Sequence, residues 1–543
     1  MPSVFNAVIN YVHGDGLAIL PEMELLLFAL GILIFDFFLE EKEKHWNAYL
    51  ALLGVAGSSF ALYLQIRRYH AARLDSSGLP GLLAFHDTIL IDGFFIVFAI
   101  LFLAAAALVI LLSIRYLNLE REEGGEYYSL ILFACVGMML MASGIDLIVL
   151  LLGLETMALS FYVLSGFLPA SKRCNESAVK FFFLGAFSTA VLAYGFSLLY
   201  GMSASTNIIQ ISDMLDRRLR FTFAHGFVDW LAVLAFVTVC AGLLFKIAAV
   251  PFHQWAPDVY EGSPTPAAAY IAFGSQIAGF AFLFRLMFYL FGEAHPAWKF
   301  LIAGIALASL IWGNLAALTQ NHLKRLLAYS SIVHAGYILL GLVAWDSTPQ
   351  SNTAATGIFF YLITYGFTTL GVFGIVIVMR QSATIGDSLD VLDGLYYRNP
   401  TVAVLLLILM LSLAGIPPTA GFMSKYLIFQ ALIETHHPAL AIFASLSMIP
   451  GLYYYLRVVG HAWMRAPGAV PSPEPNSAEA VALAVTLFVT VAAGLYAEPF
   501  TRLARYALCL RTINSRKTAS SLPESKTPRA SAGSSPWPSN CRL

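Results

Sequence analysis

The stretch LLFKIAAVPFHQW, from Leu243 to Trp255, decides how this chain folds. It lies inside a long apolar run, yet it carries a lysine, Lys246, and a proline, Pro251. A proline removes a backbone N–H and interrupts a helix, and the freed backbone groups are tolerated at membrane depth only beside protein or water. The stretch therefore predicts a membrane-spanning helix that is broken in the middle, next to a buried cation.

The rest of the sequence has the composition of a membrane protein. Of its 543 residues, 59% are hydrophobic and only 12% are charged. A helix needs roughly 20 mostly apolar residues to cross the hydrocarbon core, and runs of that kind recur without the alternation of a membrane β-barrel. We expect an all-α polytopic membrane protein with about fourteen transmembrane helices. The runs begin near Leu17, Ala48, Phe94, Tyr127, Ile145, Ser177, Phe227, Ala267, Phe300, Leu326, Gly357, Val402, Leu440 and Val481.

Several function classes are disfavoured by the same composition. The net charge is −1 and no basic stripe is present, which argues against nucleic-acid binding. The five cysteines are scattered, without the spacing of a zinc site or an iron–sulfur ligand set, so we expect no metal and no disulfide framework. No Gly-rich dinucleotide turn opens a helix after a strand, so we expect no bound nucleotide. The residues before Leu17 lack the features of a removable signal peptide.

A second broken span is predicted in LSLAGIPPTAGFMSKYLIF, where Pro417 and Pro418 precede Lys425. This is the twelfth run and the stretch around Lys246 is the seventh, so the two cross the membrane in opposite directions. Interrupted segments at corresponding positions of two halves indicate inverted-topology repeats with a transported ion near their interface.

Ionisable residues deep in apolar runs are the candidate functional residues. Glu155 lies near the middle of the fifth run, where a charge costs at least ~2.5–3.5 kcal/mol unless it finds a partner or water. The alternative is a neutral carboxyl held by a neighbouring hydroxyl. Lys246 and Lys425 are candidates for the same reason, although a lysine stem is long enough to reach the interface. Asp146, Arg285 and Lys180 lie nearer the ends of their runs, where capping or an interfacial position explains them.

The tenth run has one polar face, because Ser330, Ser331, His334 and Tyr337 are spaced by three and four residues. Two explanations are open: a satisfied contact between helices, or a hydrated proton relay to which an imidazole is suited. Gln276, in the eighth run, can bind water but cannot carry a proton. Acid and base groups spread over several helices, with no visible cofactor site, are typical of proton transfer.

These motifs resemble a known family. The chain is similar to subunit N of the proton-pumping NADH:quinone oxidoreductase, respiratory complex I, which is the bacterial relative of mitochondrial subunit 2. The resemblance covers roughly residues 20 to 465, and PDVYEGSPTP is its most specific part. The motifs are LPEMELLL, GEYYSLILFACVGMMLMASGIDLIVLLLGLETMALSFYVL, AVKFFFLGAFSTAVLAYGFSLLYG, FKIAAVPFHQWAPDVYEGSPTP, NHLKRLLAYSSIVHAGY and LAGIPPTAGFMSKY.

The resemblance implies an antiporter-like fold with two inverted five-helix repeats and a proton path along a central polar axis. It implies that Glu155, Lys246 and Lys425 are the ionisable residues of the fifth, seventh and twelfth spans. Gln276 stands where the family usually has a lysine; either water or His334 bridges that gap, or this subunit conducts protons less readily. The expected segments are an N-terminal three-helix segment (1–126), a first antiporter-like repeat (127–292), a second inverted repeat (293–465), a C-terminal helix (466–511) and a disordered tail (512–543).

The expected function is therefore that of a proton-translocating membrane-arm subunit in the bacterial inner membrane. NADH, FMN, iron–sulfur clusters and quinone are expected in partner subunits, with none of these cofactors in this chain. The expected partners are the other membrane-arm subunits and the lipid bilayer, and no nucleic acid. Two alternatives are open: a subunit of a multisubunit sodium/proton antiporter, and a structural subunit whose polar axis is vestigial.

Overall fold

The computed structural model describes residues 16–75, 81–122, 124–225, 228–291, 295–345, 351–380, 388–467 and 472–507. The predicted disordered tail, 512–543, lies outside the described residues, so that prediction stays untested.

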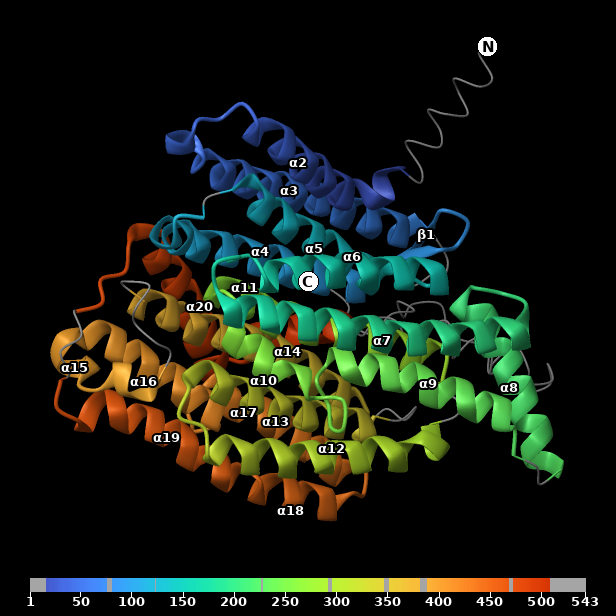
Figure 1. Ribbon diagram of the computed structural model, residues 1–543. Helices are drawn as coiled ribbons and strands as arrows, with labels where there is room; N and C mark the ends of the chain where they lie inside the picture. Colours follow the sequence, from blue (N-terminus) through green and yellow to red (C-terminus); the bar gives the residue numbers. More distant parts are fainter. Residues whose placement is uncertain are drawn as a thin grey trace, which may run out of the picture.

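The all-α polytopic fold is confirmed. The described residues contain 12 helices long and apolar enough to cross a membrane, and two shorter apolar helices occupy the remaining predicted spans. Figure 1 shows them packed side by side, with the connections gathered at the two ends of the bundle. The helices are α2 (Leu20–Asp36), α3 (Trp46–Asp75), α4 (Gly93–Glu120), α5 (Gly125–Ser143), α6 (Leu147–Ser165), α7 (Lys172–Ser203), α9 (Trp230–Lys246), α11 (Thr265–Tyr289), α12 (His295–Leu318), α13 (Leu323–Ala344), α14 (Ser351–Met379), α16 (Pro400–Ala414), α18 (Pro438–Leu446) with α19 (Met448–Met464), and α20 (Ser477–Leu495).

The seventh span is broken, as predicted. The helix α9 ends at Lys246, and a second helix, α10 (Trp255–Gly262), continues the span after an irregular turn. The peptide bond between Val250 and Pro251 in this turn is cis. Lys246 therefore lies at the C-terminal end of a half-helix, where the last carbonyl groups have no partner within the helix.

The twelfth span is broken in the same way. The helix α16 ends at Ala414, and α17 (Ala420–Glu434) continues the span. Gly415 ends α16 with a φ of +83°, a left-handed conformation that favours glycine. The Pro417–Pro418 peptide bond in the turn is cis. Both predicted breaks are thus confirmed.

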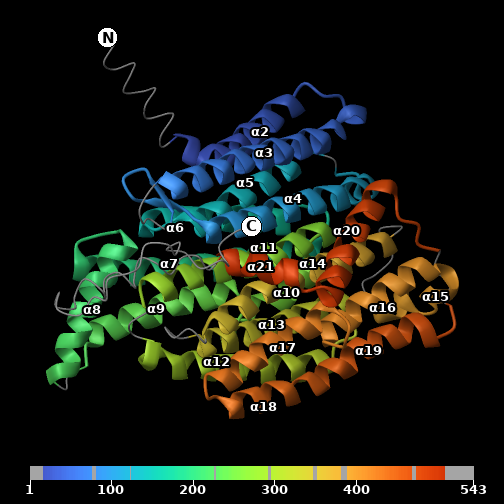
Figure 2. The ribbon, with the colours of Figure 1, turned by 180° about the vertical axis from the view of Figure 1, so that it is seen from behind.

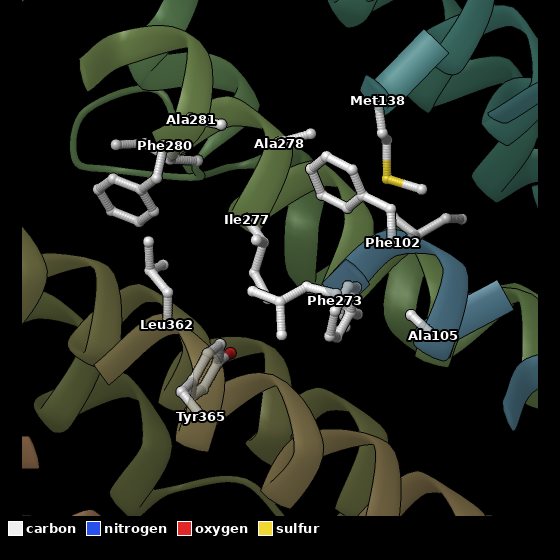
Figure 3. Close-up of a cluster of buried hydrophobic side chains, with 14 of the residues drawn as sticks. Phe102, Ala105, Met138, Phe273, Ile277, Ala278, Phe280, Ala281, Leu362 and Tyr365 are labelled. Carbon is white, nitrogen blue, oxygen red and sulfur yellow. The ribbon is translucent and has the colours of Figure 1, made fainter. Parts of the chain in front are cut away.

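The centre of the bundle is formed by α11 and α14, whose apolar windows are entirely buried. Figure 3 shows the apolar cluster between them: Ile277 and Phe280 of α11 face Leu362 and Tyr365 of α14. On the other side of α11, Phe102 of α4 extends the cluster. This apolar core packs around α11, and α11 is the helix that carries Gln276.

Short elements outside the spans were not predicted from the sequence. The segment predicted as one C-terminal helix, 466–511, contains two in its described part, because Pro499 cannot donate an N–H within a continuous helix and suits the first turn of a new one. The second of these packs against α4 and α14, on the side of the bundle seen in Figure 2. The additional elements are the antiparallel strands β1 (Leu82–Ala84) and β2 (Ile89–Ile91), α8 (Ile208–His225), α15 (Leu395–Arg398), α21 (Glu498–Ala507) and the 3-10 helices η1 (Gly16–Ile19), η2 (Glu41–Glu43) and η3 (Leu389–Leu392).

The close approach of α16 and α17 makes Gly421 a sensitive position. A Cβ atom there would meet the Ser412 carbonyl oxygen well inside van der Waals contact. We expect Gly421→Ala to destabilise the subunit by about 3 kcal/mol, the upper end of the usual cost of overpacking. The measurement is the amount of subunit retained in membranes and the thermal unfolding midpoint of the purified complex. Gly460→Ala is the control, since no atom lies within 4 Å of the added Cβ; equal stability of both variants would contradict the prediction.

Candidate functional site

Lys246 is buried at the broken end of α9. Its side chain is 2% exposed, so the alternative that it reaches the membrane interface is wrong. The Nζ atom donates to the Tyr162 hydroxyl at 3.3 Å and lies 5.6 Å from the centre of that ring. The Lys246 carbonyl accepts a hydrogen bond of 2.7 Å from Ser275 of α11. The lysine therefore joins α6, α9 and α11 at one point.

Glu155 lies on the same helix as Tyr162. The two residues are seven positions apart, which places them on one face of α6. Glu155 is half-buried, and its Oε1 atom is enclosed without a hydrogen-bond partner, so no hydroxyl of the described residues holds that oxygen. Among the described ion pairs, none joins Glu155 to Lys246 within 4.0 Å. Tyr162 is therefore the side chain of this face that contacts Lys246.

Gln276 connects the first break to α13. Its side chain is 1% exposed, and its Nε2 group donates to the Ser331 carbonyl at 3.1 Å and to the Ile247 carbonyl at 3.5 Å. Its Oε1 atom is buried without a partner among the described residues. Ile247 directly follows Lys246, and Ser331 lies one turn before His334. The amide therefore occupies the position between the two halves of the site.

His334 is held by two tyrosines from different helices. Its Nδ1 lies 2.6 Å from the Tyr361 hydroxyl of α14, and its Nε2 lies 3.1 Å from the Tyr455 hydroxyl of α19. Ser330 forms a short hydrogen bond with the same Tyr455 hydroxyl. A small cavity next to His334 is lined by Thr364, Ser412 and Ser424 among others, with room for about one water molecule.

Lys425 faces the end of the other half-helix. Its Nζ donates to the carbonyl oxygens of Leu413 (2.9 Å) and Ala414 (3.0 Å), the last residues of α16. Lys425 is buried and lies 5.2 Å from the centre of the Tyr337 ring, so it does not reach the interface. Gly415 makes this possible, since a Cβ there would press on the lysine side chain. A cation at a helix C-terminus also interacts favourably with the helix dipole.

Comparisons with known proteins show which family the chain belongs to. A family model described as NADH:quinone oxidoreductase/Mrp antiporter, TM, matches residues 142–449. NADH-quinone oxidoreductase subunit N 1 of Koribacter versatilis is 46% identical over 499 residues, which are 92% of this chain and 96% of that protein. The chain belongs to the NADH-quinone oxidoreductase subunit N family.

Solved structures match subunit N over most of its length. A chain of respiratory complex I from Thermus thermophilus with bound aureothin has a TM-score of 0.70 at 31% identity, over 89% of subunit N and 98% of that chain. A chain of the Mrp complex from Dietzia sp. has a TM-score of 0.73 at 19% identity, over 92% and 98%. The second likeness shows a shared fold alone. Subunit N is therefore a multi-pass subunit of the proton-translocating oxidoreductase of the bacterial membrane.

The sequence did not single out the tyrosines that link these residues in subunit N. Tyr162, Tyr361 and Tyr455 contact Lys246 or His334, yet aromatic residues are ordinary in apolar spans. Only Tyr162 had a usable signal, its seven-residue spacing from Glu155. The polar face of α13 had two explanations, a satisfied contact between helices and a proton relay. Each serine and tyrosine of that face has a partner: Ser331 donates to the Ala328 carbonyl and Tyr337 bonds Ser447.

The charged residues near span ends have three different roles. Asp146 caps α6 by accepting from the Ile148 N–H at 2.8 Å, as expected. Lys180 forms surface ion pairs with Glu176 and Asp258. The interfacial explanation of Arg285 is wrong, because its side chain is 0% exposed and is paired with Asp92 inside the bundle.

The sequence also did not single out Glu22 of α2. This carboxyl is buried, and its Oε2 atom has no hydrogen-bond partner among the described residues. It lies outside the segment matched by the family model.

One cluster at the surface of subunit N brings together residue types that can bind metals. Ligand atoms of Asp390, Asp393 and His461 lie within 4.8 Å of one another. Asp393 already accepts from His461 Nδ1 at 2.7 Å and pairs with Arg465 at 3.5 Å. The cluster is thus explained by ion pairs, and the expectation of no metal stays a prediction.

Proposed function

We propose that protons cross subunit N along a polar axis formed by Glu155, Lys246, Gln276, His334 and Lys425. The observation that carries this proposal is the environment of Lys246. Its ammonium group is buried at a helix break and donates to Tyr162, which lies on the same face of α6 as Glu155. Among the described residues, no carboxylate lies within ion-pair distance of this group. Such a cation keeps or releases its proton according to how close Glu155 approaches.

The energies involved are large enough to drive this exchange. An ion pair at 4 Å contributes about 4 kcal/mol at an effective dielectric constant of 20. Moving one charge through 100 mV costs about 2.3 kcal/mol. Formation or loss of one contact between Glu155 and Lys246 therefore outweighs the cost of moving a proton charge against a typical membrane voltage.

Beyond Lys246, the axis passes through groups that differ in their ability to carry charge. Gln276 cannot be ionised, so a proton passes it by way of water that hydrogen-bonds to the amide. His334 and its tyrosines can hand on a proton, because each ring nitrogen bonds a hydroxyl. The cavity beside His334 lies between α13, α14 and the α16–α17 break, which is the region that contains Lys425. The five residues thus extend from the first break to the second.

The redox chemistry belongs to other chains in this proposal. NADH, FMN, iron–sulfur clusters and quinone are bound by partner subunits, and subunit N binds none of them. The scattered cysteines and the missing dinucleotide motif support this assignment. Subunit N contacts the neighbouring membrane-arm subunits and lipid through its exposed apolar side chains, and it has no nucleic-acid partner.

Glu155→Gln tests the proposal. The amide keeps the shape of the side chain and cannot accept a proton, so we expect proton flux through subunit N to fall about tenfold to a hundredfold. The measurement is the ratio of protons moved to NADH oxidised in the purified complex in vesicles. Glu43→Gln, at an exposed surface carboxylate, is the control. An unchanged ratio and turnover in assembled Glu155→Gln complex would favour a purely structural subunit and contradict the proposal.

A further inference from the structure

Hydrogen bonds hold the half-helix α10 at both of its ends. At its start, the Trp255 indole N–H donates to the Phe245 carbonyl at 2.7 Å, directly before Lys246. At its end, Lys324 of α13 donates to the Ser263 carbonyl at 3.1 Å. The eight residues of α10 therefore span the distance between the Lys246 turn and the first turn of α13.

Ion pairs strengthen the second of these connections. The Arg325 guanidinium of α13 contacts both carboxylates of α10, Asp258 at 3.2 Å and Glu261 at 2.8 Å. Lys180 of α7 contacts the other oxygen of Asp258 at 2.9 Å. The Arg325, Asp258 and Glu261 side chains are only 21–33% exposed. A network of partly buried charges with one guanidinium shared by two carboxylates holds its geometry better than an isolated exposed pair.

The helix α13, which contacts α10, also carries the second half of the polar axis. His334 lies nine residues after Arg325 on α13, and the Ser331 carbonyl between them accepts the hydrogen bond from Gln276. A short helix moves as a rigid body, so these contacts give any shift of the Lys246 turn a path along α10. The Arg325 ion pairs continue this path to α13. These contacts form a continuous chain of packed groups of the kind that carries coupling between two sites.

We propose that Arg325 is a positioning residue that couples the Lys246 half of the polar axis to the His334 half, and that α10 is the rigid helix that connects the two. This inference rests on the proposed function of the axis. It assigns a role to the PDVYEGSPTP stretch, which supplies Asp258 and Glu261. Arg325 touches no member of the polar axis among its described ion pairs, so its effect is indirect.

The first measurement is coupling in the assembled complex. Arg325→Gln removes both ion pairs between α13 and α10, and we expect the proton flux through subunit N to fall about two- to fivefold while NADH oxidation continues. Lys180→Gln is the matched control, because it removes a cation from the same carboxylate but leaves α13 attached; its proton-to-NADH ratio should equal that of the wild type. A fall as large in Lys180→Gln as in Arg325→Gln would overturn the proposal.

The second measurement is hydrogen–deuterium exchange of the amides of residues 330–337 in the intact complex. With Arg325 present, Lys246→Gln should change their exchange rates about two- to fivefold; with Arg325→Gln, the same substitution should change them clearly less, since only the links through Gln276 and Lys324 then remain. If Arg325→Gln does not assemble, Arg325→Lys serves instead: one atom of the native arginine, Nη1, contacts both carboxylates, and lysine keeps a cation there on a more flexible stem, so an intermediate change is expected. Equal responses with and without the native arginine would overturn the proposal.

The outcomes separate this inference from the function on which it rests. If Glu155→Gln lowers the proton-to-NADH ratio and Arg325→Gln leaves it intact, only the coupling role of Arg325 is wrong. If Glu155→Gln itself leaves the ratio intact, the polar axis is not a proton path.

Discussion

Lys246→Arg is expected to leave the complex assembled and its quinone reductase active, while proton flux through subunit N falls about a hundredfold. Arginine keeps the positive charge at the broken end of α9, but its guanidinium does not release a proton under physiological conditions. The substitution therefore separates the charge of Lys246 from its ability to exchange a proton. The measurement is the proton-to-NADH ratio of the purified complex in sealed vesicles, with the ratio falling to the level that the rest of the complex sustains.

Two further variants make this result interpretable. Lys42→Arg, at an exposed lysine in η2, should behave as the wild type. Lys246→Met also removes the charge but keeps an apolar side chain of similar length. Its proton-to-NADH ratio should fall as that of Lys246→Arg does. A normal ratio in Lys246→Arg would show that the charge alone suffices, and the exchange of a proton at Lys246 would then be excluded.

Asp92→Asn is expected to destabilise subunit N by about 3–5 kcal/mol, the usual cost of leaving one member of a buried ion pair alone. The Arg285 guanidinium bonds both carboxylate oxygens of Asp92, at 2.6 and 3.0 Å, and both side chains are almost fully buried. Asparagine can still accept from the Phe95 N–H that Asp92 caps, so the substitution removes the charge and leaves the cap.

The thermal unfolding midpoint of the complex and the amount of subunit N in membranes measure this effect. Asp92→Asn combined with Arg285→Gln should recover part of the loss, because no unpaired charge then remains. Glu498→Gln is the control; it weakens an exposed pair with Arg502 at 3.0 Å, which solvent screens, and should leave the unfolding midpoint close to that of the wild type. Wild-type stability of the single Asp92 variant would contradict the prediction.

The spans were predictable because the membrane imposes a simple rule on the sequence. Each needs a long apolar run, and a proline within a run marks a break. The runs near Phe227 and Val402 therefore identified α9 and α16 along with their interruptions. The amphipathic α8 and the short β1–β2 hairpin follow no such rule, since neither crosses the hydrocarbon core, and neither was predicted from the sequence.

The candidate site was predictable where an ionisable group stood in an apolar run. Lys246 and Lys425 were found this way, and both are buried. Their partners were not found. Lys425 bonds two main-chain carbonyls of α16, and a backbone acceptor has no signature in the sequence. Arg285 was placed at the interface because it lies near the end of its run, but the pairing residue Asp92 comes from a helix that is distant in sequence.

When Lys425 is protonated, its ammonium group carries an elementary charge, and its hydrogen bonds attach that charge to the main chain of α16. An electric field across the bilayer exerts a force on any charge inside it, corresponding to about 2.3 kcal/mol per 100 mV for a full crossing. Here the force is applied to the end of a helix as well as to a side chain. Through a protonated Lys425, a membrane potential therefore acts on the main chain of the twelfth span, at the point where that span is interrupted.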